Sequence, residues 1–218
     1  MVGVMSGCAS TAGEQPSAGQ MLKNANDTMS ALKSVTIDSV TSKSSGDGSS
    51  TRLTTDLKSR CAFKATWVRG ASLEQIRIGG TDYVRPNRAY IEWSGRSMAG
   101  TEEQTRWIKT PSSESTPGDG LARCTQDFAS FGVATKGKPV KVGGKPAIQL
   151  VVTDKADKAD KGGSCTFYVA TEGKPYILKV VYKGAEYSTT TSYSAFDEPL
   201  DVRPPAKADV MDVSGLAR

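Results

Sequence analysis

The most constraining feature of this sequence is a succession of short segments in which polar and apolar residues alternate, each closed by a turn. Alternation with a period of two predicts strands with one buried face, and short turns join antiparallel neighbours. Glycine and proline mark the turns most clearly at 44–50, 79–80, 143–146 and 172–175. Strands are predicted at 35–40, 51–57, 61–67, 72–78, 81–85, 89–93, 139–142, 146–153, 165–171, 176–182 and 186–196, with a shorter one at 107–108.

Two segments instead repeat apolar residues with the spacing of a helix. In residues 17–33 the repeat forms one stripe of Met21, Leu22, Ala25, Met29 and Leu32. Ser17 and Gln20 stand in the spacing of a capping box, which predicts that the helix begins there. In residues 120–130 a second, shorter helix is predicted from the spacing of Leu121, Cys124 and Phe128.

An antiparallel sheet of about ten strands is too wide to stay flat, so it must curl, close or split. Two helices can cover one of its faces. We therefore predict an α+β fold in which a strongly curved antiparallel sheet, a half-barrel of about ten strands, wraps around two or more helices. A closed barrel of the lipocalin type is the alternative. Residues 17–218 are expected to form this single domain, with the tail from Asp197 packed along the sheet edge.

The sequence contains no histidine, the most common general base and metal ligand at neutral pH. Serine-histidine and cysteine-histidine catalysis are therefore excluded, and four cysteines without a CxxC pair do not form a zinc site. A hydrolase that uses two carboxylates remains the open alternative. No recognisable pair stands out among its candidates, Asp56, Glu74, Asp82, Glu92 and Asp127. We expect a protein that is not an enzyme, with no catalytic residue, no metal and no cofactor.

The charge of the chain indicates which partners to expect. The net charge is +5 over 218 residues. No dense block of lysine and arginine alternates with aromatic residues, so nucleic acid is not an expected partner. A weak attraction to anionic membrane surfaces or acidic polymers is the alternative to a simple contribution to solubility.

The amino terminus indicates a location outside the cytoplasm. Residues 5–8 (MSGC) resemble a bacterial lipobox, in which the cysteine is acylated and becomes the new amino terminus. Residues 1–7 are then the remnant of a lipoprotein signal peptide, and the small, polar residues 8–16 form a flexible tether. No segment approaches the roughly 18 apolar residues of a membrane-spanning helix. We expect lipid on Cys8 to hold the protein at the outer face of the cell membrane; a chance match in a polar tail is the alternative.

Further segments carry a resemblance to a known family. They are MSALKSV at 29–35, IGGTDYVRP at 78–86, VATEGKPY at 169–176 and the proline pair at 204–205. With the lipobox and the tether, they make residues 17–213 similar to actinobacterial lipoproteins of the LolA/LolB-like superfamily, of the LppX and LprG type. The resemblance implies a half-open antiparallel sheet curved around helices, with acyl chains of lipids or lipoglycans held in the hollow between them.

An apolar wall for such a ligand requires large side chains around the hollow, because each buried CH₂ contributes about 0.8 kcal/mol. Ordinary core packing is the alternative for each candidate. The candidates are Phe63, Trp67, Leu73, Ile76, Ile78, Tyr83, Ile91, Trp93 and Phe167. The resemblance also implies a disulfide between Cys61 and Cys124, which leaves Cys165 outside it.

These points lead to one expected function and two alternatives. The expected function is that of a monomeric envelope lipoprotein that binds lipid or lipoglycan acyl chains in the hollow between sheet and helices. The first alternative is a regulatory or sensory lipoprotein that binds another envelope protein. The second is the carboxylate-based hydrolase.

Overall fold

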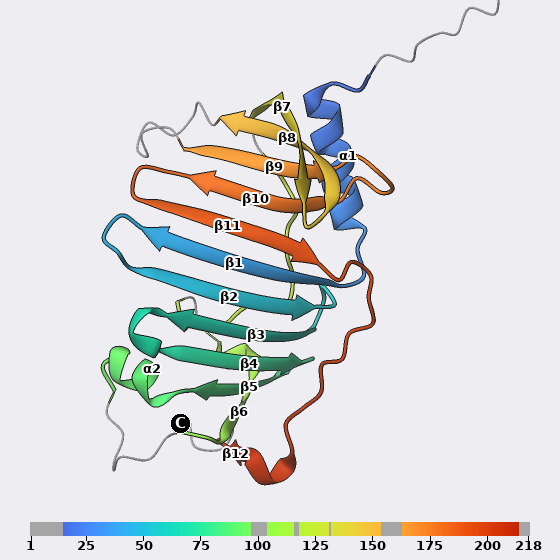
Figure 1. Ribbon diagram of the computed structural model, residues 1–218. Helices are drawn as coiled ribbons and strands as arrows, with labels where there is room; N and C mark the ends of the chain where they lie inside the picture. Colours follow the sequence, from blue (N-terminus) through green and yellow to red (C-terminus); the bar gives the residue numbers. More distant parts are fainter. Residues whose placement is uncertain (1–14, 97–103, 116–117, 131, 154–162, 214–218) are drawn as a thin grey trace, which may run out of the picture.

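The computed structural model describes residues 15–96, 104–115, 118–130, 132–153 and 163–213. Twelve strands form one sheet in the order β12-β6-β5-β4-β3-β2-β1-β11-β10-β9-β8-β7. Figure 1 shows the strands stacked as a ladder, with α1 beside the upper rungs. The edge strands β7 and β12 do not pair with each other, so the sheet stays open. The predicted α+β half-barrel is therefore confirmed, and the alternative of a closed barrel is not formed.

The described residues form two α-helices, α1 (Ala18–Ser30) and α2 (Arg88–Trp93). The strands are β1 (Val35–Lys43), β2 (Gly48–Thr55), β3 (Arg60–Trp67), β4 (Ser72–Ile78), β5 (Thr81–Pro86), β6 (Trp107–Pro111), β7 (Val133–Val142), β8 (Lys145–Thr153), β9 (Ser164–Ala170), β10 (Ile177–Lys183), β11 (Tyr187–Ser194) and β12 (Val210–Asp212). Single 3₁₀ turns follow β3 and β6 and precede β12, at Val68–Gly70, Ser112–Glu114 and Lys207–Asp209. The sequence pattern missed β12, because three residues are too few to show alternation.

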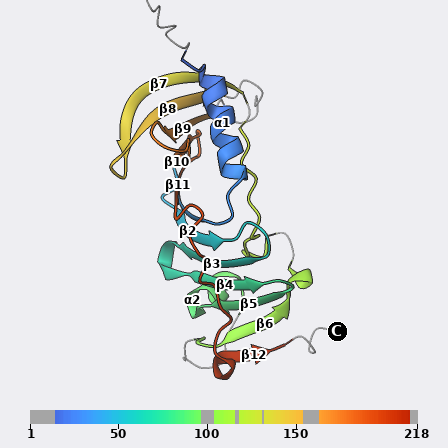
Figure 2. The same cartoon turned by 90° about the vertical axis from the view of Figure 1, so that its right-hand side faces the viewer.

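Two antiparallel meanders meet in the middle of the sheet. One runs from β1 to β6 and the other from β7 to β11, and β1 joins them by pairing with β11 from Thr36–Ser194 to Lys43–Tyr187. β12 alone lies parallel to its neighbour, β6. Figure 2 shows that the sheet curves around the side on which α1 lies, most strongly at β7 and β8. We call this side the inner face and the opposite side the outer face.

α1 begins and packs as its sequence predicts. Ser17 is the N-cap, and its Oγ accepts a hydrogen bond from the Gln20 backbone N–H at 3.2 Å. The Gln20 side chain donates to Asn24 instead of returning to Ser17, so only half of the capping box is formed. The buried side of the helix consists of Ala18, Leu22, Ala25 and Met29.

The main core lies between α1 and the inner face of the sheet. Its strand residues come from both meanders and are Val35, Ile37, Leu53, Cys61, Leu150, Val152, Phe167, Val169 and Ile177. Burial of a large apolar side chain contributes about 1.5–3 kcal/mol. One helix thus holds the two meanders against a common core.

The helix predicted at residues 120–130 is wrong. Residues 121–130 have no helical turn, and Figure 2 shows them as an extended segment that crosses the inner face. The polar groups around Ala122 and Cys124 bond to side chains of the sheet rather than to backbone four residues away. These tertiary contacts override the helical spacing of the apolar residues.

The strand predicted at residues 89–93 is also wrong, because this segment forms α2. The Asn87 side chain is the cause, since its Oδ1 accepts from the Tyr90 backbone N–H at 2.9 Å and caps a helix. The same oxygen accepts from the Ser72 backbone N–H at 2.9 Å, which fixes the start of α2 against β4.

The tail after β11 first crosses the strand ends and then lies along the sheet edge as β12, as predicted. Arg60 of β3 donates to the Val202 carbonyl at 2.7 Å, and the Val202 side chain is buried. Figure 1 shows this segment descending past the ends of several strands before it reaches β12. The tail therefore connects β11, in the middle of the sheet, with the edge formed by β6 and β12.

Candidate ligand-binding site

The inner face of β3 and β4 is covered by residues 121–130, which we call the crossing segment. Its first contact is with Gln75 of β4. The Ala122 N–H donates to Gln75 Oε1 at 2.8 Å, and the Ala122 carbonyl accepts from Gln75 Nε2 at 3.3 Å. Gln75 Nε2 also donates to Asp82 at 3.0 Å, and Arg77 donates to both oxygens of Asp82, at 2.7 and 2.6 Å. Buried polar groups on two strands thus hold the start of the crossing segment.

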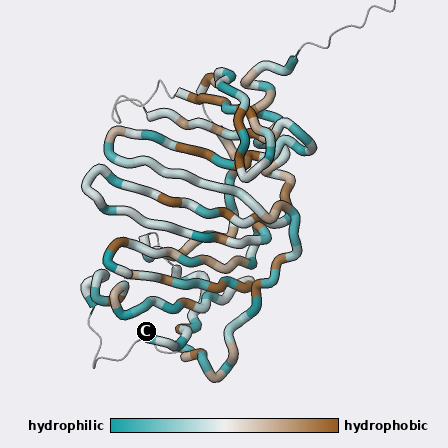
Figure 3. Tube along the Cα trace, viewed as in Figure 1, coloured by the Kyte–Doolittle hydropathy of each residue, from teal (hydrophilic) through white to brown (hydrophobic). Residues whose placement is uncertain are grey.

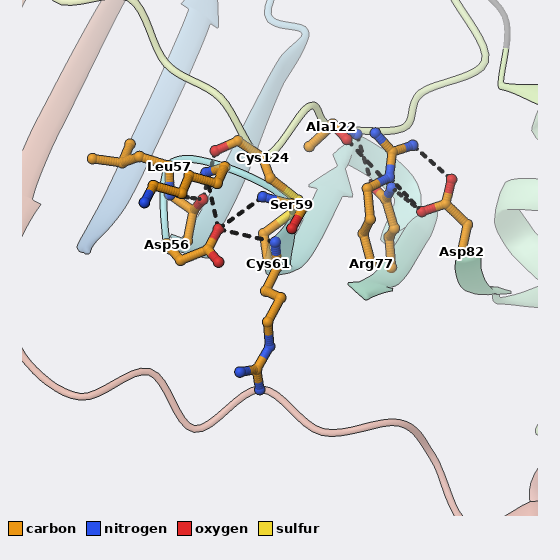
Figure 4. The surroundings of a disulfide bond; sticks show 12 residues. Asp56, Leu57, Ser59, Cys61, Arg77, Asp82, Ala122 and Cys124 are labelled. Carbon is orange, nitrogen blue, oxygen red and sulfur yellow. Dashed lines mark hydrogen bonds and ion pairs between the residues drawn. A yellow bond between two sulfur atoms is a disulfide. The ribbon is translucent and has the colours of Figure 1, made fainter. Parts of the chain in front are cut away.

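A disulfide fixes the crossing segment next to this network (Figure 4). Cys61 of β3 is bonded to Cys124, and both cysteines are buried. The Thr55 hydroxyl donates to the Cys124 carbonyl at 2.5 Å and accepts from the Leu57 N–H at 2.8 Å. The Cys61–Cys124 pairing that the resemblance implied is confirmed.

The other end of the crossing segment reaches β11 and α1. Phe128 packs edge-on against Tyr193 of β11, with 6.0 Å between the ring centroids. Burial raises the pKa of Tyr193 to about 12, so its hydroxyl stays neutral at physiological pH. Ser130 accepts a hydrogen bond from Asn26 of α1 at 2.7 Å. The crossing segment therefore spans the inner face from β4 to α1.

The turn between β2 and β3 stands beside the crossing segment. Asp56 Oδ1 accepts from the backbone N–H groups of residues 58, 59 and 60, each at 2.9 Å. Partial burial raises the pKa of Asp56, but these donors and the Arg60 charge outweigh it, and the net pKa is lowered. Leu57 has a φ of 60°, in the left-handed region, and its side chain packs against the main core.

A cleft of about 780 Å³ opens between these three parts, which are the end of α1, the β2–β3 turn and the crossing segment. Its volume lies within the range of about 300–1,000 Å³ that is typical of ligand pockets. Apolar side chains from all three parts line it, namely Leu32, Leu57 and Phe128. Its other lining residues are Ser30, Asp56, Lys58, Gln126, Asp127 and Ala129. The cleft thus combines an apolar floor, continuous with the main core, with polar groups around it.

Comparison with solved structures finds the same architecture in mycobacterial lipoproteins. The lipoprotein LppX of Mycobacterium tuberculosis matches 87% of this chain and 100% of its own, with a TM-score of 0.54 and 13% identity. LprF of Mycobacterium bovis matches 87% of this chain and 97% of its own, with a TM-score of 0.54 and 11% identity. The chain has the fold of LppX and LprF. No protein-family model and no curated protein matches its sequence.

Within this LppX-like sheet, four of the nine predicted wall residues lie on the inner face. Phe167 of β9 is buried in the main core with α1, and Phe63 packs against the same core. Leu73 is fully buried on β4, and Trp67 stands at the end of β3. The cross-strand register places Phe63 and Trp67 on the face of Cys61, which is the face that the crossing segment covers.

Three of the nine lie on the outer face and are not brought together with the others. Ile76 is opposite both Ala62 and Tyr83, and Ile78 follows it two positions later on the same side. The sequence alone selected the apolar side of β4. Two of the inner positions next to them are instead Gln75 and Arg77, which are polar because they bond to the crossing segment and to Asp82. A single wall made of all nine residues is therefore excluded.

The last two of the nine lie on α2. Trp93 stacks on Trp67, with ring centroids 5.5 Å apart and an interplanar angle of 25°. Ile91 is partly exposed on the same helix. None of the nine residues lines the cleft at the end of α1. The cleft residues Leu57 and Phe128 were missed, because a left-handed leucine in a turn gives no periodic signal and the spacing of Phe128 indicated a helix that does not form.

The inner face becomes more polar towards the tips of the β1–β2 and β10–β11 hairpins. Ser39 and Thr41 of β1 lie opposite Thr191 and Thr189 of β11, and each pair of hydroxyls is 3.0 Å apart. Figure 3 shows β11 pale along most of its length, whereas brown segments gather near α1. The inner face therefore has an apolar end at α1 and a hydroxyl-lined end at the hairpin tips.

Several predictions concern residues or groups outside this site. Cys8 and the predicted signal remnant at 1–7 lie outside the described residues. The side chain of Cys165 is half-buried on β9. Among the described residues, no three His, Cys, Asp or Glu side chains come close enough together to hold a metal ion. The described helices are also too short or too polar to cross a membrane.

Proposed function

We propose that this protein is an extracytoplasmic lipoprotein that binds an apolar ligand, an acyl chain, and that the cleft at the end of α1 is where the chain enters. The observation that carries the proposal is the position of the cleft. Leu57 and Phe128 line it and also pack against the main core, so a bound chain would extend an existing apolar surface. Each CH₂ transferred from water contributes about 0.8 kcal/mol.

The way in which the crossing segment is fastened supports this proposal. It is held by the disulfide at Cys124 and by Asn26 at Ser130, and the cleft lies against the residues between these two points. A ligand in the cleft would therefore lie against a segment that is fixed at both ends. Lys58 and Asp127 at the cleft provide partners for a polar head group.

We also propose that the protein is not an enzyme, and the environments of its carboxylates support this. A two-carboxylate hydrolase needs a general acid with a raised pKa. Asp56 lines the cleft, but its pKa is lowered. Burial raises the pKa of Glu74, while Arg85 and Lys64 outweigh that effect and lower it. Asp82 is likewise engaged, by Arg77.

Membrane attachment through acylated Cys8 is the remaining part of the proposal. It is supported by the sequence MSGC at residues 5–8 and by the polar residues that follow. Mass spectrometry of the protein isolated from its native membrane tests it. A mass increase that maps to Cys8 is expected, and an unmodified thiol at Cys8 would contradict it.

Binding of a dansyl-labelled undecanoic acid tests the acyl-chain site. We expect the probe to bind the wild-type protein saturably, with increased and blue-shifted fluorescence. Ala129→Trp places a large ring in the cleft from an exposed position and should weaken binding at least tenfold. Phe128→Asp places a charge at the apolar floor and should have a similar effect.

The matched control is Val40→Asp, which puts the same charge at an exposed apolar position on the outer face. It should leave probe binding unchanged, and circular dichroism establishes that each variant is folded. If the wild-type protein does not bind the probe, the acyl-chain site is wrong, and a lipoprotein that binds another envelope protein becomes the better explanation. Equal losses in Ala129→Trp and Val40→Asp would place the site elsewhere.

A further inference from the structure

A second recess lies at the opposite ends of β2 and β3 from the cleft. The two ends of β2, Gly48 and Thr55, are separated by roughly 20 Å at about 3.3 Å per residue. The recess has a volume of about 220 Å³. It is lined by Thr41, Lys43, Asp47, Gly48, Ser49, Trp67, Val68 and Trp93. None of these residues takes part in the cleft at α1.

One wall of this recess is aromatic. Trp67 and Trp93 stack at 5.5 Å, and Tyr90 packs against both, with centroid distances of 5.3 and 5.8 Å. The side chain of Trp93 nevertheless remains 63% exposed. A large aromatic residue that is fixed by its neighbours and still open to solvent presents a rigid face to a ligand at little cost in conformational entropy.

The opposite wall is polar. It is formed by the β1–β2 hairpin, which contributes the hydroxyls of Thr41 and Ser49, the ammonium group of Lys43 and the carboxylate of Asp47. The inner-face hydroxyl pairs of β1 and β11 continue from this wall, through Thr41 and Thr189. Donors and acceptors therefore alternate over a short distance beside the tryptophan pair.

We infer that this recess is a saccharide subsite. A sugar ring has one face of C–H groups, which packs on the negative face of an aromatic ring, and a rim of hydroxyls that both donate and accept hydrogen bonds. The tryptophan pair fits the first requirement, and Thr41, Ser49 and Asp47 fit the second. The volume is below the range of about 300–1,000 Å³ that is typical of pockets for larger ligands, which suits a single ring.

Other ligand chemistries fit the recess less well. A bare acyl chain offers no donor or acceptor to Thr41, Ser49, Lys43 and Asp47, which line the recess. A phosphate ligand would meet Lys43 but would also bring its negative charge next to Asp47, whereas a neutral sugar can bond to both. The subsite rests on its own contacts and not on the acyl-chain proposal, although one glycolipid could reach both places along the inner face.

Calorimetric titration with the methyl glycosides of glucose, mannose, galactose, arabinose and N-acetylglucosamine tests the subsite. At least one is expected to bind saturably. Trp93→Ala, which removes an exposed side chain, should weaken that binding at least tenfold. Trp107→Ala is the matched control, because Trp107 lies on the outer face under Arg85 and should leave the affinity unchanged. Asp47→Asn should weaken binding several-fold.

A second titration distinguishes the source of the saccharide. The octyl glycoside of the same sugar, kept below its micelle concentration, should bind more tightly than the methyl glycoside if a glycolipid head group is the natural ligand. Equal affinities indicate a free saccharide. No binding of any glycoside, or equal losses in Trp93→Ala and Trp107→Ala, would overturn the subsite. So would a Trp93→Ala variant that loses only binding to phospholipid vesicles. The dansyl probe reports on the acyl-chain site separately, so the failure of either proposal can be recognised.

Discussion

The two ends of this sheet are covered in different ways. At one end, β7 to β11 lie under α1, whose apolar side meets an apolar inner face. At the other, β3 and β4 lie under the extended crossing segment, which is held by a disulfide and by side-chain hydrogen bonds. A helix satisfies its own backbone groups, so it needs only apolar partners. An extended segment does not, so it needs polar partners on the sheet.

This difference explains why the inner face of β4 is polar. Gln75 and the Arg77–Asp82 pair occupy positions that would carry apolar residues under a helix. Gln75 satisfies both backbone groups of Ala122, which an apolar side chain could not do. The cleft lies where the two kinds of cover meet, between α1 and the crossing segment.

Removal of the disulfide should destabilise the part of the sheet that the crossing segment covers, and it should have the largest effect on stability. The bond joins residues 63 positions apart, and its loss is expected to lower the free energy of unfolding by about 4 kcal/mol. Urea denaturation of Cys61→Ala/Cys124→Ala measures this. Hydrogen exchange should rise in residues 121–130 and in β3 and β4 and stay low in α1.

Cys165→Ala is the control for this experiment, because it removes a thiol without removing the bridge. It should change the free energy of unfolding far less. Uniformly faster exchange in both ends of the sheet would contradict the view that the two ends are held independently.

Truncation of Met29 should instead destabilise the part of the sheet that α1 covers. Met29 is fully buried on α1, and Met29→Ala is expected to lower the free energy of unfolding by about 3 kcal/mol, because it leaves a cavity in the main core. Exchange should rise in α1 and in β7 to β10. Met21→Ala, at a half-buried position on the same helix, should cost about 1 kcal/mol. Equal losses for the two methionines would show that the predicted stripe is not what holds the helix.

Acid should affect the turn beside the crossing segment, with the smallest effect of the three. The folded pKa of Asp56 lies below its ordinary value of 3.8. Its contribution to stability is therefore complete above that value and is lost as the pH falls through the folded pKa. Asp56→Asn keeps an acceptor oxygen but does not titrate, so urea midpoints measured from pH 6 downward should fall less steeply than in the wild type. Parallel curves for the two proteins would contradict this.

Sequence reasoning placed α1 and most strands correctly and failed for the crossing segment, for a physical reason. The stripe in residues 17–33 and the alternation in β8 to β10 are periodic, and both were placed correctly. The crossing segment carries the apolar spacing of a helix but does not form one, because its course depends on Cys61 and Gln75, which are distant in sequence. The predicted wall residues Ile76, Ile78 and Tyr83 were assigned to the wrong side of β4 and β5 for the same reason.

The sequence by itself determined that the chain forms a wide antiparallel sheet, too wide to stay flat, that follows an amino-terminal helix, because alternation, turns and the helical stripe are local properties. It also excluded histidine-based chemistry, since the residue is absent. Only the tertiary structure decided which face of each strand is inner, that residues 121–130 cross that face as an extended segment, and where the cleft opens. These depend on contacts between residues far apart in the chain, such as Phe128 with Tyr193 and Trp67 with Trp93.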